Sequence, residues 1–196
     1  MEPDERRRQI LSAARKLFSK HGYDGVSSEL IAREAGVARG LLNHYFGTKR
    51  DLYLEVVRGM VRVPPPPVPE YVAGTTPEQR VVESIDDWLE MVSRNRETWL
   101  AGLRAESLSR DPAIEAIFEE ARQEATDRLI AVLGLGPAAK APADLHAVLR
   151  AYGGMAEAAT RQWLEHKRLS REQVAAFLTS SLAYLTGDGL EAVRNA

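Results

Sequence analysis

Hydrophobic residues recur every three or four positions along nearly the whole chain, the spacing that places them on one face of an α-helix. The first run comprises Ile10, Leu11, Ala14, Leu17 and Phe18, and it stops just before Gly22. No segment alternates apolar and polar residues as a half-buried β-strand does. The pattern therefore predicts an all-α fold of about nine helices.

Capping residues predict where the helices of the N-terminal third begin and end. Ser27 or Ser28 can accept a hydrogen bond from the first turn of a short second helix, which ends at Gly36. A third helix is predicted over about 38–45. A fourth, over 48–63, opens with the sequence Thr-x-x-Asp, a variant of the capping box.

Stronger start signals follow in the rest of the chain. Thr76 and Ser170 each precede a Gln by three positions, which is the capping-box spacing, and Asp111 precedes a proline. Five helices are predicted here. The first begins at about 76, and the others cover about 96–107, 111–134, 143–166 and 171–186.

The sequence VPPPPVP at 63–69 divides the chain, because consecutive prolines cannot continue a helix and favour an extended spacer. We therefore predict a helix-turn-helix domain over 1–63, which includes the connecting helix 48–63. A proline-rich connector over 64–75 would follow, and then a helical bundle over 76–196.

Composition restricts the function classes. Hydrophobic residues make up 44% of the 196 residues and charged residues 28%, as in globular proteins, and no apolar run approaches the length of a membrane span. The absence of cysteine excludes disulfides and thiolate sites. With no secretory signal at the N-terminus, we expect a cytoplasmic protein without membrane partners.

Charge is distributed unevenly along the chain. Residues 1–63 contain 12 Lys and Arg against 8 Asp and Glu, whereas the remaining residues contain 14 against 20. A basic N-terminal part on an acidic body fits a polyanion bound at one end only.

The stretch GLLNHYFGTKRDLY at 40–53 indicates that this polyanion is DNA. In a helix-turn-helix motif the second helix enters the major groove of DNA with its N-terminal end. There Arg39 can bridge guanine O6 and N7, Leu41 can contact a thymine methyl and Asn43 can pair with adenine. Gly40 allows close approach of the backbone. The residues suited to phosphate oxygens on the flank are His44, Tyr45 and Lys49.

Residues 10–60 resemble the DNA-binding domain of the TetR family of transcriptional regulators, through LFSKHGYDGVS, IAREAGV and RGLLNHYFGTKRDLY. The resemblance implies a homodimer that binds a palindromic operator in double-stranded DNA, usually as a repressor released by a small molecule bound in the C-terminal core. It also implies that Ser27 caps the second helix and contacts a phosphate, and we predict that Ser28 contacts the DNA as well.

This sequence departs from the family pattern at three positions. Asn43 replaces a common aromatic, which favours base readout over packing on the sugar and phosphate. Ala38 replaces a frequent Ser or Thr cap of the third helix, and Leu30 replaces a residue that is often polar.

The C-terminal body is larger than a DNA-binding domain needs, and two roles can account for it. The helices over 143–166 and 171–186 carry broad apolar, alanine-rich stripes, which favour a four-helix dimer interface or, alternatively, core packing within one subunit. The second role is ligand binding. Candidate ligand contacts, for which packing in the core is the alternative, are Trp88, Met91, Trp99, Leu103, Arg104, Phe118, Arg122, Met155 and Trp163.

No motif supports an enzyme. The sequence lacks HExxH, GxSxG, a P-loop and GxGxxG, and no His–carboxylate group has metal-ligand spacing. We therefore expect no catalytic residue, metal site or cofactor. The alternatives left open are a DNA-binding regulator without a small-molecule ligand and, less well supported, a helical small-molecule-binding protein or enzyme.

Overall fold

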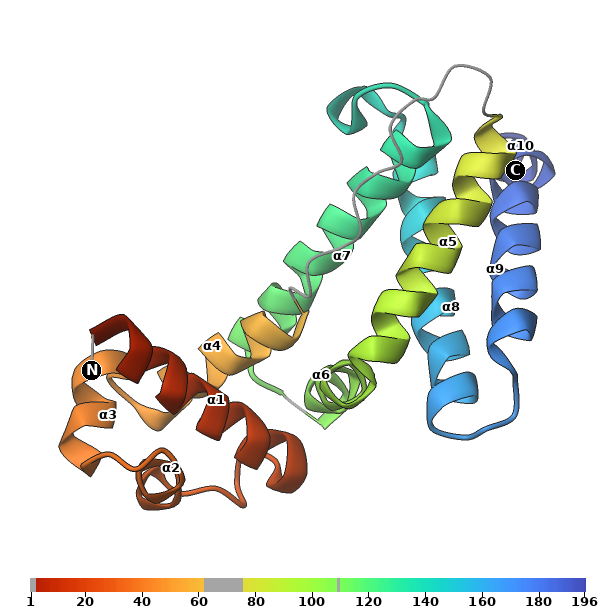
Figure 1. The fold of residues 1–196 in the computed structure, drawn as a ribbon. Coiled ribbons are helices and arrows are strands. Elements are labelled where there is room, and N and C mark those ends of the chain that lie inside the picture. Colours follow the sequence, from red (N-terminus) through yellow and green to blue (C-terminus); the bar gives the residue numbers. More distant parts are fainter. Residues whose placement is uncertain (1–2, 62–75, 109) are drawn as a thin grey trace. The chain divides into compact units, whose positions relative to one another are not determined.

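The computed structural model describes residues 3–61, 76–108 and 110–196 (Figure 1). Within these ranges the chain is helical and contains no β-strand, which confirms the all-α prediction. The connector predicted for 64–75 lies outside the described residues. The helices are α1 (Pro3–His21), α2 (Ser28–Glu34), α3 (Arg39–Phe46), α4 (Lys49–Val61), α5 (Pro77–Arg94), α6 (Arg96–Leu108), α7 (Pro112–Leu133), α8 (Ala143–Leu164), α9 (Arg171–Thr186) and α10 (Asp188–Arg194), with a 3-10 turn at Ala138–Lys140.

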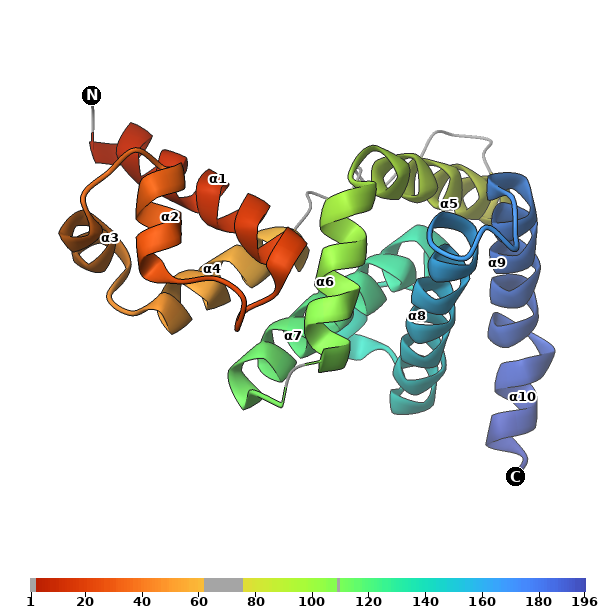
Figure 2. The same ribbon diagram turned by 90° about the horizontal axis from the view of Figure 1, so that it is seen from below.

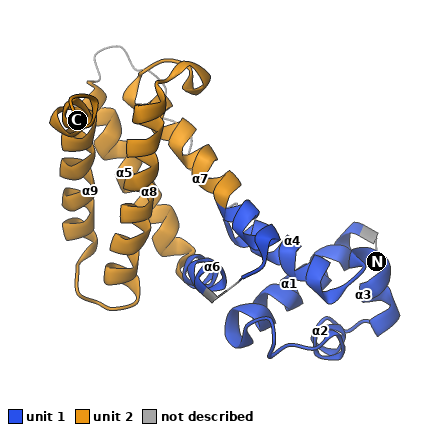
Figure 3. Cartoon of the chain, turned by 180° about the vertical axis from the view of Figure 1, so that it is seen from behind, with its two compact units in different colours: residues 1–63, 97–118 blue, residues 64–96, 119–196 orange. Residues whose placement is uncertain are grey.

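The chain divides into two compact units (Figure 3). Unit 1 contains residues 1–63 and 97–118, and unit 2 contains residues 64–96 and 119–196. The sequence predicts a division of the chain at the proline run, whereas the compact units follow the packing of the helices. Packing adds most of α6 and the first turns of α7 to the N-terminal helices.

The predicted capping residues begin the helices as expected. Thr76 and Ser170 each form a complete capping box, at the starts of α5 and α9. Before α4, the backbone N–H of Thr48 donates to Asp51 Oδ2 and the backbone N–H of Asp51 donates to Thr48 Oγ1, both at 3.1 Å. These local bonds satisfy amide groups that lack partners within the helix, which explains why the helix starts could be predicted from sequence.

Unit 1 is built on an apolar core from α1 to α4, with Ile10, Ile31, Leu42 and Leu52 fully buried. A second cluster joins α4 to the later residues of this unit. It comprises Leu54, Val57, Ile114, Ile117 and Phe118. Because this cluster is apolar and almost completely buried, it fixes the start of α7 against α4.

Unit 2 places α5, α8 and α9 side by side (Figures 1 and 2). Leu89, Leu149 and Leu178, one from each helix, have no exposed surface and lie at the centre of its core. Arg80 is also buried, and its Nε donates to the carbonyl of Val132 at 3.2 Å, near the end of α7. No helix in the described ranges combines the length and apolarity needed to cross a membrane.

Candidate nucleic-acid interface

The turn between α2 and α3 has the geometry of a helix-turn-helix motif. Of the two candidate serines, Ser27 is the cap of α2, and its Oγ accepts from the backbone N–H of Leu30 at 3.1 Å. Ser28 is the first residue of the helix. Gly36 has a φ of +62°, a backbone conformation that a side chain would strain. Ala38 precedes α3 without a side-chain cap, as expected.

Helix α3 has one buried face and one exposed face. Leu42 and Phe46 are buried in the core of unit 1. Leu41 and Tyr45 are half-buried at the edge of that face. The exposed residues are Arg39, Gly40, Asn43 and His44. A guanidinium, an amide and an imidazole thus share the solvent face, and their contacts with DNA remain predictions.

Gly40 leaves the surface of α3 open between the polar groups. A Cβ at this position would meet no atom within 4 Å, so internal packing does not require a glycine here. The position is therefore free to admit another molecule close to the backbone, as the prediction of base-edge approach requires.

The side chain of Arg39 is paired with a carboxylate from α2. Its Nη1 forms an ion pair with Glu29 Oε1, and the two side chains are 62% and 58% exposed. Hydrogen bonding from its own backbone N–H, and next the charge of Arg39, hold the pKa of the Glu29 carboxyl below its usual value against the opposing effect of desolvation. Sequence reasoning missed this pair, because Glu29 lies at the start of α2, at the far end of that helix from the turn that precedes Arg39.

Lys49, predicted to bind a phosphate, is engaged within unit 1. Its Nζ donates to the carbonyl oxygens of Tyr23 and Val26, each at 3.0 Å, and lies 3.9 Å from the centroid of the Tyr23 ring. Lys49 therefore fastens the segment that follows α1 to the start of α4. An ammonium group has three donors, so one N–H beyond these two bonds can serve the predicted phosphate.

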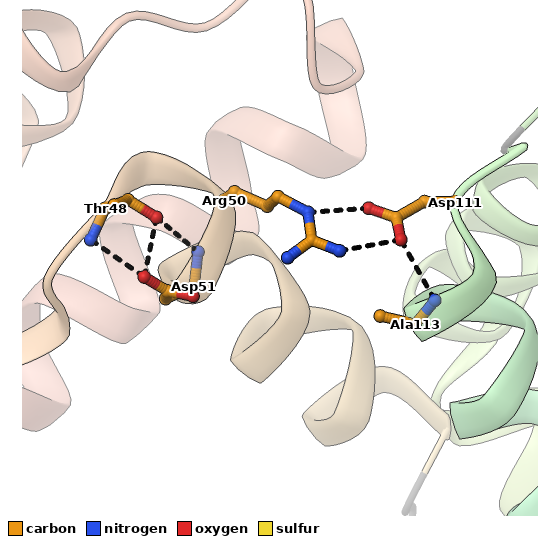
Figure 4. Close-up of polar contacts among 5 residues, drawn as sticks. All are labelled: Thr48, Arg50, Asp51, Asp111 and Ala113. Atoms are coloured by element: carbon orange, nitrogen blue, oxygen red, sulfur yellow. Dashed lines mark hydrogen bonds and ion pairs between the residues drawn. The ribbon is translucent and has the colours of Figure 1, made fainter.

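One further ion pair of unit 1 joins α4 to the start of α7 (Figure 4). Arg50 donates from Nε to Asp111 Oδ2 and from Nη2 to Oδ1, both at 2.8 Å. Asp111 Oδ1 also accepts from the backbone N–H of Ala113 at 2.9 Å, so the same carboxylate caps α7. The hydrogen bond from Arg50 is the main cause that lowers the pKa of the Asp111 carboxyl.

Two family models match this chain. Residues 10–56 match the one described as "Bacterial regulatory proteins, tetR family". Residues 77–185, more than half of the chain, match "Tetracyclin repressor-like, C-terminal domain". The chain belongs to the TetR family. This confirms the resemblance found in the sequence, and it agrees with the expectation that the chain is not an enzyme, because the family consists of transcriptional regulators.

Individual TetR-family relatives agree with this assignment. The HTH-type transcriptional regulator HbdR of Aromatoleum sp. (strain CIB) is 35% identical over 129 residues, which cover 65% of this chain and 55% of that protein. The HTH-type transcriptional regulator BetI of Agrobacterium fabrum is 45% identical over 62 residues, 32% of this chain and 30% of that protein. The matched stretches therefore span about half or less of these curated relatives.

Solved structures share the fold. A tetR-family transcriptional regulator from Streptomyces coelicolor has a TM-score of 0.73 at 24% identity, over 98% of this chain and 87% of that one. A putative tetR family transcription regulator from Shewanella sp. PV-4 has a TM-score of 0.66 at 25% identity, over 91% of this chain and 94% of that one.

The nine predicted ligand contacts are divided between the two units. Unit 1 holds Trp99, Leu103, Arg104 and Phe118, and unit 2 holds Trp88, Met91, Arg122, Met155 and Trp163. Leu103 and Phe118 are buried, and Arg104 is exposed. Trp88, Met155 and Trp163 are half-buried against the core of unit 2. Ligand contact by any of the nine remains a prediction.

A concave region in unit 1 holds none of these candidates. It lies between α1 and α4, has a volume of about 340 Å³, and is lined by Leu11, Arg15, Glu55, Val56, Arg58 and Gly59.

Arg122 lies in a group of charged side chains on α7 and α8 that sequence reasoning identified only in part. Its Nε is 3.8 Å from Glu157 Oε1, and its Nη1 is 3.9 Å from Glu119 Oε2, which also pairs with Arg150. Burial raises the pKa of the Glu157 carboxyl, against the opposing attraction of Arg122 and two further arginines. Glu157 was missed because its ion-pair partner Arg122 comes from another helix, α7, although Arg150 and Arg161 lie on α8 with it.

Proposed function

We propose that this TetR-family chain is a homodimeric repressor that binds a palindromic DNA operator and is released by a small molecule. The observation that carries the DNA-binding part is the exposed face of α3, where Arg39, Asn43 and His44 flank an unobstructed Gly40. These groups can donate to or accept from base edges and phosphates, and each lies on the motif that enters the major groove in such proteins.

Selection from a pool of random duplexes tests this proposal directly. Purified full-length protein is incubated with the pool at two salt concentrations, and bound duplexes are recovered and sequenced. The proposal expects one inverted repeat, with half-sites about one helical turn apart, to be enriched at both concentrations. Enrichment of a single, unrepeated half-site would contradict the dimer. No enrichment by a folded protein would contradict the function.

The proposed dimer uses α8 and α9. On α9, Phe177 and Tyr184 lie seven positions apart, on one face of the helix, and are 46% and 59% exposed. On α8, Ala147 and Ala151 are exposed, and the small residues would allow another helix to approach closely. By contrast, Ala156 is buried in the core of unit 2, so only part of the alanine-rich stripe is available for an interface.

A charge on this surface tests the dimer. Tyr184→Glu would bury a carboxylate in the proposed interface, and we expect monomers by sedimentation velocity together with weaker binding to the inverted repeat. Val82→Glu is the matched control, because Val82 is 51% exposed on α5 and lies outside the proposed surface. A Tyr184→Glu protein that remains dimeric would exclude this interface.

The proposed release by a ligand depends on α7. This helix contributes Ile114 and Ile117 to the apolar clusters of unit 1, and Ile130 and Val132 to the core of unit 2. A ligand that changes the position of α7 in the larger unit would therefore act on α4 through the Ile114–Ile117 packing and the Arg50–Asp111 pair.

To identify the ligand, small molecules are screened for release of the labelled operator duplex from the protein. Arg50→Gln then tests the coupling. We expect operator affinity to persist while the ligand concentration needed for release rises. Arg94→Gln, which removes an exposed arginine paired with Glu90 on α5, is the control. An unchanged ligand response in Arg50→Gln would contradict this route, and a screen without any releasing compound would favour a regulator without a ligand.

A further inference from the structure

The ion pair between Arg39 and Glu29 sets the geometry of the first side chain of α3. Arg39 begins α3, and Glu29 lies in the first turn of α2. Both side chains are more than half exposed, so the pair lies on the surface that unit 1 would present to DNA. Water alone could solvate an exposed arginine at this position, but here the Glu29 carboxylate holds it.

Glu29 is itself held in place. Its carboxyl interacts with its own backbone N–H and with the Ser27 side chain at the start of α2, and both interactions favour the ionised form. Ser27 in turn is fixed as the cap of the helix through Leu30. The carboxylate is therefore positioned by α2 and presents an anchor to the guanidinium.

A guanidinium carries five N–H donors in a rigid plane. When one edge of the plane is bound to a carboxylate, the other edge remains free to donate two parallel hydrogen bonds, as guanine O6 and N7 require. Holding the plane before binding lowers the conformational entropy that is lost on recognition. The same carboxylate repels phosphates, which weakens binding wherever no base contact compensates.

We propose that Glu29 is a specificity-determining positioning residue, which orients Arg39 for one base pair of each half-site and lowers affinity for unrelated duplexes. This inference rests on the proposed function, because it requires Arg39 to read a base.

The test compares Glu29→Gln with Glu34→Gln. Glu34 lies on the same helix and forms an ion pair with Lys16 at 2.6 Å. Each variant removes one negative charge and one exposed ion pair, so any general gain in attraction to DNA is matched. Affinity is measured by fluorescence anisotropy for the selected inverted repeat, for duplexes with each base pair replaced, and for a scrambled duplex.

We expect Glu29→Gln to reduce discrimination at one base pair of each half-site by about two- to fivefold, the range that exposed ion pairs supply. Glu34→Gln should leave discrimination unchanged. In an Arg39→Ala background, Glu29→Gln should have no further effect on base preference, because its action passes through Arg39. Thermal unfolding of each variant verifies that the exposed substitutions leave the fold intact.

Two results would overturn the inference while leaving the proposed function in place. One is that Glu29→Gln discriminates base pairs as well as Glu34→Gln does. The other is that the loss of discrimination is the same with and without Arg39, which would show that Glu29 acts independently. A wild-type protein without sequence preference would instead refute the proposed function itself.

Discussion

Replacing Lys49 by methionine separates two roles of one ammonium group. The side chain makes two hydrogen bonds to the Tyr23 and Val26 carbonyls and a cation–π contact with the Tyr23 ring. Hydrogen bonds from charged donors contribute about 1.5–3 kcal/mol each when well shielded. Because Lys49 is only half-buried, we expect a smaller total.

A loss of about 2 kcal/mol in the free energy of unfolding is the resulting expectation for Lys49→Met. For a chain of this size it corresponds to a Tm lower by about 4–8 °C. Lys20→Met is the matched control, since Lys20 is an exposed lysine at the end of α1. Thermal unfolding followed by circular dichroism measures both.

The predicted phosphate contact of Lys49 gives a second, independent readout. If the remaining N–H reaches a phosphate, Lys49→Met should lower the slope of log K against log salt by about 0.9 for each phosphate that is no longer neutralised, and by about twice that in a dimer. A Tm equal to that of Lys20→Met would refute the fastening role inferred from the three interactions of the ammonium group. An unchanged salt slope would refute the phosphate contact.

The remaining predictions concern pH and buried charge. The pKa of Asp111 is lowered in the folded protein, so the Arg50 pair stabilises the fold above the unfolded pKa of about 3.9 and ceases to do so as the pH falls through the folded value. The stability difference between wild type and Arg50→Gln should therefore shrink in urea titrations at progressively lower pH, and a constant difference would contradict it. The pKa of Glu157 is raised, so ionisation weakens the fold as the pH rises from about 4.3 through the folded value. Glu157→Gln should then be at least as stable as wild type at pH 7 and lose this advantage at pH 4, whereas a destabilised variant at pH 7 would show that Arg122 outweighs desolvation.

Local signals in the sequence predicted most of the helices and their starts. Ser27, Thr76 and Ser170 cap helices through bonds to residues three positions away, and such bonds leave a readable pattern. The exposed face of α3 was also predictable, because helical periodicity alone places Leu42 inward and Asn43 outward. The short helix α10 was not anticipated, since Asp188–Arg194 follows Gly187 without a side-chain cap.

Contacts between distant segments were not predictable in this way. Arg50 and Asp111 are 61 positions apart, and neither neighbourhood indicates the other. The partners of Lys49 are backbone carbonyls, which every residue has, so no residue type marks them. The grouping of residues 97–118 with the N-terminal helices depends on the same kind of contact, the apolar packing of Ile114, Ile117 and Phe118 against α4.

Arg39→Ala tests most directly whether the exposed face of α3 reads DNA sequence. On the selected repeat, we expect wild type to lose about 1–3 kcal/mol when one particular base pair of a half-site is replaced, and Arg39→Ala to bind both versions equally. Arg94→Ala, a loss of the same charge from an exposed ion pair on α5, should retain the wild-type preference. If Arg39→Ala retains that preference at every base pair, α3 does not read the sequence through Arg39.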